Sequence, residues 1–279
     1  MLAELRESDA TGELATIYAE IRRLWGVPYV SSLQRHLATR PGWLPWTWAA
    51  LGSVFASGRA QRAAWRASEG LSVPRLDPIS RDALGVWGVD ARGEAAIRAA
   101  CASFVRVSPV NLVLSGLLRR LLNGSRPDGH GPAPAAVWAP PAPVGALPAL
   151  VDPAALPAAE RALLTSLGTT VGGTPFVAGL YRMLARWPAF FAHVATVVRP
   201  RMDAPDARAA CRRLLDAVDA EVPAVFDALP ALPAAPPMPA AAEFPGVLAA
   251  LDTYRQTSPE MVVFGRMISD ALPPLARSG

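Results

Sequence analysis

Residues 26–41 read GVPYVSSLQRHLATRP, and residues 173–188 read GTPFVAGLYRMLARWP. Eight of the sixteen aligned positions are identical, and the two stretches lie 147 positions apart. Self-similarity at a fixed offset is the sequence signature of a repeated structural unit. The pair therefore predicts that the chain contains two copies of one unit.

A second pair of stretches follows in the same order. Residues 108–114 read SPVNLVL, and residues 258–264 read SPEMVVF, 150 positions later. Because the two pairs keep their order, we predict two whole repeats, 1–125 and 158–279, which form one compact unit. The segment 126–157 between them is rich in Pro, Ala and Gly, a composition typical of an extended linker.

The hydrophobic pattern inside each repeat is helical. Leu14, Ile17, Ile21 and Leu24 fall at spacings of three and four, the spacing of one helix face. We find no run in which apolar and polar residues alternate, so no strand is predicted. Further helices are expected at residues 43–55, 82–89, 94–104, 109–122, 208–218 and 247–254. The predicted fold class is all-α, with two helical repeats related by approximate two-fold symmetry.

The composition excludes several kinds of chemistry. The chain has 279 residues, and all 27 basic residues are Arg. Without Lys, neither a lysine Schiff base nor a P-loop lysine exists. The three His and two Cys show no C-x-x-C motif, so neither a dithiol site nor a zinc-finger set is expected. Replacement of every Lys by Arg is typical of a GC-rich, bacterial coding sequence.

The charge and hydropathy patterns bound the partners. The net charge of +4 comes from scattered Arg residues without a nucleic-acid motif, so no nucleic-acid partner is expected. The apolar stretch 187–198 is shorter than the ~20 residues of a membrane span, and residues 1–16 do not resemble a signal peptide. We expect a soluble, cytoplasmic protein with no membrane partner, as a monomer or homodimer.

A pocket is expected where the two repeats meet. Interfaces between such halves commonly hold small-molecule sites. Helix starts at Pro28 and Pro175 would present backbone N–H groups suited to a small acid. The alternative, that the repeated motif makes only symmetric core contacts, stays open. The predicted substrate-binding residues are Ser31, Leu33, Gln34, Ala178, Gly179, Leu180, Tyr181 and Phe264.

The duplicated pattern Gly-x-Pro-Φ-Val-x-x-x-aromatic-Arg-x-Leu-Ala-x-x-Pro resembles the group I 2-haloacid dehalogenases, the DehI family. The opening residues 10–22 are also similar to that family. The resemblance implies an all-α pseudo-dimer that needs no metal and no organic cofactor, so we expect neither. It also implies displacement of halide from carbon 2 of D- and L-haloacids by a water molecule. An aspartate in the second motif would act as the base, and an asparagine from the first repeat would position the water.

The chain departs from this pattern at the base. The asparagine matches Asn111, but the aspartate position is Leu180, and residues 161–202 contain no Asp or Glu. Leu accepts no proton, and the amide of Asn111 does not act as a base near neutral pH. Gln34 in turn replaces an aromatic residue. We take Asn111 and Glu260, which adjoins the counterpart of Asn111, as the candidate catalytic residues.

The histidines offer weaker candidates for a replacement base. His36 is interpreted as a solvent-facing or capping residue, and His193 as a satisfied core residue on an apolar helix. His130 falls in the glycine-rich linker, where we expect it to be solvated. Whether His36 or His193 reaches the pocket stays open.

Three functions compete on these grounds. The first is an enzyme with a remodelled pocket, acting on a small carboxylic acid or natural-product substrate without the family aspartate. The second is a hydrolytic 2-haloacid dehalogenase with an unidentified base. The third is a non-catalytic small-molecule-binding homologue. We favour the first, because the asparagine and both motif copies are kept while the pocket changes polarity at two positions.

Overall fold

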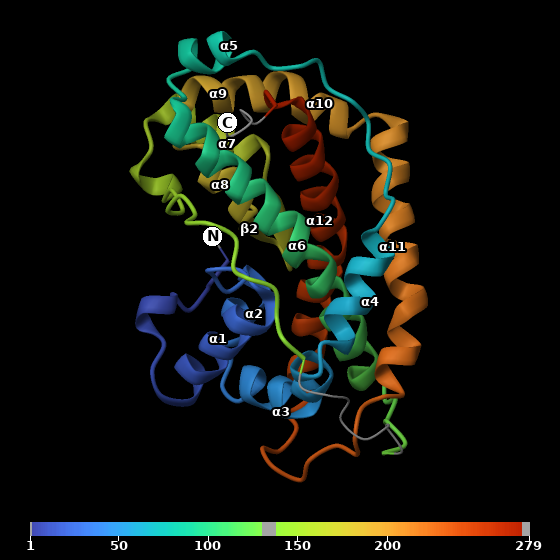
Figure 1. Ribbon diagram of the computed structural model, residues 1–279. Helices are drawn as coiled ribbons and strands as arrows, with labels where there is room; N and C mark the ends of the chain where they lie inside the picture. The colour runs from blue at the N-terminus through green and yellow to red at the C-terminus, as the bar shows by residue number, and fades with distance from the viewer. Residues whose placement is uncertain (1, 130–137, 275–279) are drawn as a thin grey trace.

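The computed structural model describes residues 2–129 and 138–274, and these residues form a helical protein (Figure 1). Its helices are α1 (Gly12–Trp25), α2 (Ser32–Leu37), α3 (Trp43–Ala56), α4 (Arg59–Ser68), α5 (Arg81–Val86), α6 (Ala91–Leu122), α7 (Ala158–Ser166), α8 (Gly179–Leu184), α9 (Pro188–His193), α10 (Arg199–Met202), α11 (Pro205–Phe226) and α12 (Phe244–Ala271). Short 3-10 turns lie at Glu7–Asp9, Pro153–Ala155 and Ala241–Glu243, and a π-helical turn at Val194–Val198. The all-α prediction is confirmed.

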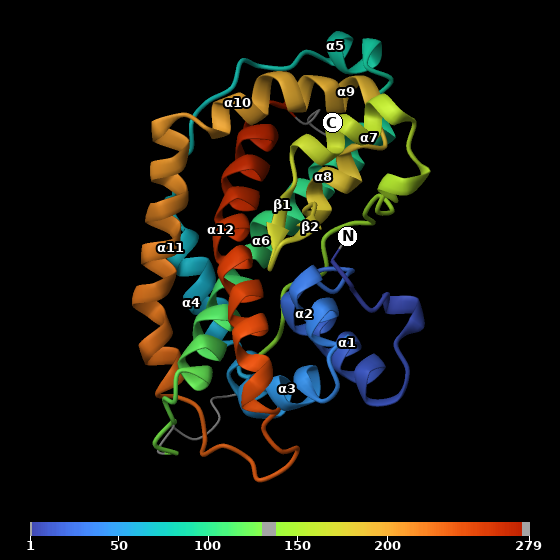
Figure 2. The ribbon, with the colours of Figure 1, turned by 180° about the vertical axis from the view of Figure 1, so that it is seen from behind.

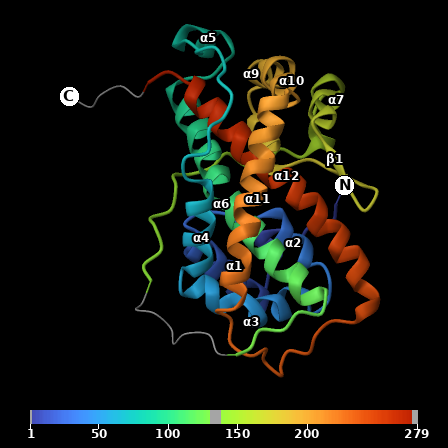
Figure 3. The ribbon, with the colours of Figure 1, turned by 90° about the vertical axis from the view of Figure 1, so that its right-hand side faces the viewer.

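Two long helices, α6 and α12, form the centre of the molecule and pack along one another. Helix α11 and the shorter α4 lie beside them on one side (Figures 1 and 3). Helices α1 to α3 gather at one end, and α7 to α9 lie toward the other (Figure 2). The two central helices therefore contribute to the surroundings of both helical groups.

Each of the two central helices contains a proline, and the sequence pattern predicts a helix boundary at the first of them. Pro109 lies inside α6 and Pro259 inside α12. The separate helices predicted at residues 94–104 and 109–122 are one continuous helix, which is a correction. A proline inside a helix costs about 3 kcal/mol. Most of α6 on both sides of Pro109 is buried, so the packing of both halves offsets this cost.

A small hairpin corrects the expectation of no strands. β1 (Thr169–Val171) pairs with β2 (Thr174–Phe176) in antiparallel register, with Val171 opposite Thr174. The turn between them is Gly172-Gly173, and both glycines have positive φ. Two-residue hairpin turns of this kind favour glycine because side chains rarely adopt that conformation. Three-residue strands are too short to show an alternating pattern.

The two helix starts predicted at Pro28 and Pro175 are also wrong. Helix α2 begins at Ser32 after its N-cap Ser31, and α8 begins at Gly179. Pro175 lies in β2 instead. Both helices have only six residues, so their aligned peptide dipoles are small. The helix dipoles therefore contribute little to the electrostatics at these two helix starts.

The described part of the linker is extended, apart from the turn Pro153–Ala155. Residues 130–137, including His130, lie outside the described residues. Helices α2 and α8 start 147 positions apart, the offset of the repeated motif. The duplication and its boundaries nevertheless stay predictions.

One described helix, α6, is long and apolar enough to cross a membrane, but 83% of its apolar window is buried inside the protein. This burial is typical of the core helix of a soluble protein.

Candidate functional site

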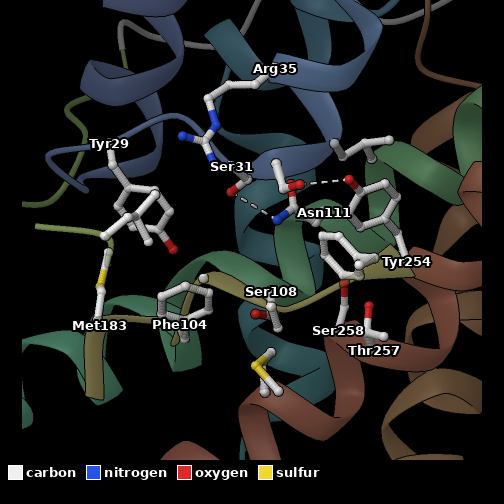
Figure 4. A pocket seen from close by; sticks show the side chains of 17 residues that line it. Tyr29, Ser31, Arg35, Phe104, Ser108, Asn111, Met183, Tyr254, Thr257 and Ser258 are labelled. Carbon is white, nitrogen blue, oxygen red and sulfur yellow. Dashed lines mark hydrogen bonds between the residues drawn. The ribbon is translucent and has the colours of Figure 1, made fainter. Parts of the chain in front are cut away.

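A cavity lies where α2, α6, α8, α12 and the end of β2 meet (Figure 4). Its volume is about 50 Å³. Because roughly 10–15 Å³ holds one water molecule, this space suits a ligand of a few non-hydrogen atoms. The lining residues are Tyr29, Ser31, Ser32, Leu33, Arg35, Phe104, Ser108, Asn111, Leu150, Phe176, Ala178, Gly179, Met183, Tyr254, Thr257, Ser258 and Met261.

The side chain of Asn111 is held in one orientation at the wall of this cavity. Asn111 Nδ2 donates to Ser31 Oγ at 3.0 Å, as Figure 4 shows, and Asn111 Oδ1 accepts from Gln34 Nε2 at 3.0 Å. Gln34 is fully buried and lies outside the cavity lining. The amide nitrogen of Asn111 thus faces Ser31 and its oxygen faces Gln34, whose own Oε1 is buried without a partner. Gln34 therefore positions Asn111, and one N–H of Asn111 is left for another acceptor.

Two hydrogen-bond donors on the lining residues make no hydrogen bond of ordinary geometry to the protein, although Ser31 lies close enough to the Tyr29 hydroxyl to lower its pKa. They are Nε of Arg35 and the hydroxyl of Tyr29, and both atoms are buried. Buried polar groups in proteins are nearly always paired with protein, water or ligand. The ring of Tyr29 stacks on Phe104 with their centroids 5.4 Å apart, which fixes it against the wall. Both unpaired groups suit an anionic or hydrogen-bond-accepting ligand.

The tyrosine hydroxyls at the cavity are donors at neutral pH. Burial raises the pKa of Tyr29 and of Tyr254 well above the ordinary value of 10. Both phenols therefore stay protonated and neutral. Since the lining contains no Asp or Glu, Arg35 is the charged group of the wall.

The carboxylate of Glu4 nevertheless contacts residues of the cavity wall, although Glu4 itself does not line the cavity. Glu4 accepts a hydrogen bond from Ser32 Oγ, and Glu4 Oε2 lies 2.6 Å from Arg35 Nη2. Ser32 Oγ is also 2.7 Å from the Tyr254 hydroxyl. A serine hydroxyl has one proton, and Ser32 gives that proton to Glu4, so Tyr254 is the donor to Ser32. The order of donation is therefore Tyr254 to Ser32 to Glu4.

The N-terminal segment is fixed in place by further bonds. Leu2 N donates to Pro175 O, and Leu5 N donates to Arg35 O, each at 3.0 Å. Glu7 accepts from the backbone N–H of Val30 at 2.7 Å. The segment thus connects both copies of the repeated motif, and Glu4 projects from it toward α2.

The structure brings together five of the predicted site residues. Ser31, Leu33, Ala178, Gly179 and Asn111 all line the cavity. Their roles in binding or catalysis stay predictions.

Five other predicted site residues lie elsewhere, and the first is Gln34, which is fully buried and does not line the cavity. Leu180 and Phe264 are fully buried and do not reach the cavity. Tyr181, whose ring packs edge-on against Phe264, and Glu260 line a neighbouring cavity of about 130 Å³. There Glu260 lies 3.6 Å from Arg199 Nη1, and burial raises the pKa of Glu260. Glu260 is therefore not placed beside Asn111.

Neither histidine reaches the cavity. His36 is buried, not solvent-facing, and its Nδ1 lies 2.9 Å from Ala3 O. His193 stacks on Trp87 with ring centroids 4.5 Å apart. Burial lowers the pKa of both. Among residues 2–129 and 138–274, no group of three or more His, Cys, Asp or Glu is placed to hold a metal ion.

Sequence reasoning missed several wall residues. Arg35 recurs as Arg182 in the second motif, and that recurrence was the available signal. Tyr29 likewise has an aromatic counterpart, Phe176. Nothing around Glu4 marks it, because its contact with Ser32 depends on the path of the N-terminal segment.

The fold is that of the D-2-haloacid dehalogenases among solved structures. A mutant of such an enzyme in complex with D-2-CPA superposes with a TM-score of 0.73, at 18% identity over 97% of this chain and 96% of the other. Another mutant gives 0.74 at 19% identity, and a complex with L-LA gives 0.72 at 18%, with the same coverage. At these identities the likeness establishes the fold alone.

No protein-family model matches the chain, and the search of curated proteins gives no match either.

Proposed function

We propose that the cavity binds a small carboxylic acid and that the protein acts on it without a cofactor and without an aspartate in the second motif. The observation that carries the proposal is the pair of unpaired buried donors, Arg35 Nε and the Tyr29 hydroxyl, on residues that line a cavity without carboxylates. Leaving such a donor unpaired costs about 1–3 kcal/mol. A bound carboxylate would satisfy these donors.

The shape of the cavity supports a small acid over a bulky natural product. The volume of about 50 Å³ admits a ligand of only a few non-hydrogen atoms. Phe104, Met183 and Met261 supply apolar walls, against which a short alkyl or halogen substituent packs. The solved structures with this fold belong to enzymes that are named for small haloacids.

The experiment is a calorimetric titration with 2-chloropropionate and with its uncharged amide. We expect the acid to bind and the amide to bind at least about tenfold more weakly, because a hydrogen bond to a charged group contributes about 1.5–3 kcal/mol. Equal affinity for both, or no binding of the acid and its 2-hydroxy and unsubstituted analogues, contradicts the proposal.

Hydrolytic dehalogenation is the second candidate, and one contact favours it. Glu4 accepts a hydrogen bond from Ser32, a residue of the cavity wall, so a carboxylate is coupled to the site. Halide release from 2-chloropropionate supports this reaction. Binding of 2-chloropropionate without halide release leaves chemistry on another small acid. Absence of turnover across the acids that bind supports the non-catalytic homologue.

A further inference from the structure

We propose that Glu4 is the general base of this cavity and that it takes its proton through the hydroxyl of Ser32. This inference rests on the proposed function and commits the cavity to hydrolysis at carbon 2 of a haloacid. Glu4 lies 176 positions before Leu180, the position at which the sequence motif lacks an acid. The base would thus come from the N-terminal segment and not from the second motif.

The hydrogen bonds around Ser32 have the direction that such a relay needs. Ser32 donates to Glu4 Oε1 and accepts from the Tyr254 hydroxyl. Ser32 and Tyr254 both line the cavity. A hydroxyl oxygen has two lone pairs, so Ser32 Oγ has one left to accept a hydrogen bond from a water molecule in the cavity. The side chain of Ser32 therefore links the cavity to the carboxylate.

The carboxylate is held in a restricted environment. The side chains of Glu4 and Arg35 are 15% and 12% exposed, and Glu4 Oε2 is paired with Arg35 Nη2. That pair leaves Oε1 directed at Ser32. The backbone of Leu5 is fixed to Arg35 O, and Ala3 O lies 2.9 Å from His36 Nδ1. The residues on either side of Glu4 are thus bound to α2, which fixes the geometry of the relay.

The reaction balances without an added reactant. The oxygen of a water molecule forms a bond to carbon 2 while the carbon–halogen bond breaks, and the bonding electron pair leaves with the halide. The proton of the water passes to Ser32 Oγ as the proton of Ser32 passes to the Glu4 carboxylate. The products are a 2-hydroxy acid, a halide ion and protonated Glu4, which returns its proton to solvent. Asn111 would orient the water with its remaining N–H.

The test compares Glu4→Gln and Ser32→Ala with the unaltered protein. Gln keeps the shape of Glu4 and still accepts from Ser32, whereas Ser32→Ala keeps the Glu4–Arg35 pair. Because general base catalysis contributes roughly 10²–10⁴-fold, each variant should lose at least about 100-fold in kcat for halide release from 2-chloropropionate. The calorimetric Kd should change by less than about fivefold.

The pH profile separates a base from a structural residue. A general base gives kcat an acid limb, and this limb should be absent from the residual activity of Glu4→Gln. Glu7→Gln is the matched control, because Glu7 fixes the same segment through Val30 N. This control should retain the activity and the acid limb.

Three results would overturn the relay. One is full activity in Glu4→Gln or Ser32→Ala. Another is an equal loss of kcat in Glu7→Gln, which would show that the segment matters and not the carboxylate of Glu4. The last is binding of 2-chloropropionate by the unaltered protein without halide release. This result would contradict the relay but would still support the small-acid site. Failure of the protein to bind any small acid would contradict the proposed function itself.

Discussion

At the scale of single residues, the site combines a hydrogen-bonded amide with buried donors that have no hydrogen-bond partner. Gln34 and Ser31 satisfy one hydrogen-bonding position at each end of the Asn111 amide. Arg35 Nε and the Tyr29 hydroxyl remain buried and unpaired. A fixed amide beside unpaired donors is an arrangement preorganised for a ligand, because little has to move when the acid binds.

Replacement of Tyr29 by Phe should separate binding from stability. The change removes an unpaired buried hydroxyl, so the free energy of unfolding of the empty protein should hold or rise, by up to about 1 kcal/mol. The affinity for 2-chloropropionate should fall about tenfold, since the ligand loses one donor. Urea unfolding and calorimetry measure the two quantities.

Tyr181→Phe is the matched control for this prediction. Its hydroxyl is also buried without a hydrogen bond of ordinary geometry, but it lies near Arg199 in the neighbouring cavity. The affinity of this variant should equal that of the unaltered protein. Equal losses of affinity in both variants, or none in Tyr29→Phe, would contradict the assignment of the ligand to the Asn111 cavity.

Introducing an acid at position 180 should destabilise the protein and add no dehalogenation. Leu180 is fully buried and does not line the cavity. In Leu180→Asp an apolar contact is lost and a polar group is buried without a partner, so stability should fall by at least about 3 kcal/mol. Thermal unfolding and halide release measure both effects. A stable variant with increased halide release would show that residue 180 reaches the substrate.

The sequence was informative about which residues cluster and uninformative about which atoms face the cavity. The motif placed Ser31, Ala178 and Gly179 together, and all three lie at the cavity. It could not separate them from Leu180, which follows on the same short helix but points into the core. The direction of a side chain depends on where its helix begins, and both helix starts differed from the expected prolines.

At the scale of elements, the N-terminal segment and α2 behave as one unit. His36 on α2 lies against Ala3 O, and burial lowers the pKa of His36 below its ordinary value of 6.5. Below about pH 6.5, His36 takes up a proton in the unfolded chain, whereas the His36 ring of the folded protein stays neutral. The folded state should therefore lose stability as the pH falls through that window.

This linkage is measurable with His36→Asn, whose amide nitrogen can replace the Nδ1 donor. Between pH 7.5 and pH 5 the unaltered protein should lose more unfolding free energy than the variant. The folded and unfolded states differ in the pKa of His36, and each tenfold difference in proton affinity contributes up to about 1.4 kcal/mol. Above pH 7.5 the difference between the two proteins should no longer change with pH. Parallel stability profiles in urea would show that His36 titrates alike in both states.

The contact between α6 and α12 depends on Gly265. A Cβ at this position would lie 3.0 Å from Val105 Cγ2 and 3.2 Å from Cys101 O. Gly265→Val should therefore push the two central helices apart and reduce stability by about 1–3 kcal/mol, the typical cost of overpacking. The control is Gly85→Val in α5, where a Cβ meets nothing within 4 Å. Equal stability losses in both variants would contradict close packing at Gly265.

Helices could be predicted from the sequence where buried residues recur at helical spacing. They could not be predicted where tertiary packing overrides the conformational preference of a single residue. The pattern at residues 43–55 predicted α3 within one residue of its observed end, Ala56. The interruption predicted at Pro109 is absent, because α6 is buried on both sides of it. The hairpin β1–β2 depends on a two-glycine turn and three-residue strands, too short a pattern for periodicity to detect.

At the scale of the whole molecule, one chain brings two distant motif copies to a single cavity. Ser31 and Arg35 come from the first copy and Ala178 and Gly179 from the second, while Asn111 arrives on α6. The fold shared with D-2-haloacid dehalogenases persists at 18–19% identity. Residue 180 is Leu, where the sequence resemblance predicted an acid, and the proposed small-acid site depends on the cavity between these segments.

The most direct measurement is a crystal structure of the protein grown with 2-chloropropionate. The account predicts the carboxylate of the ligand in the Asn111 cavity, accepting hydrogen bonds from Arg35 Nε and the Tyr29 hydroxyl. A cavity that holds only water at saturating ligand, or a ligand seated instead beside Arg199 and Glu260, would contradict it.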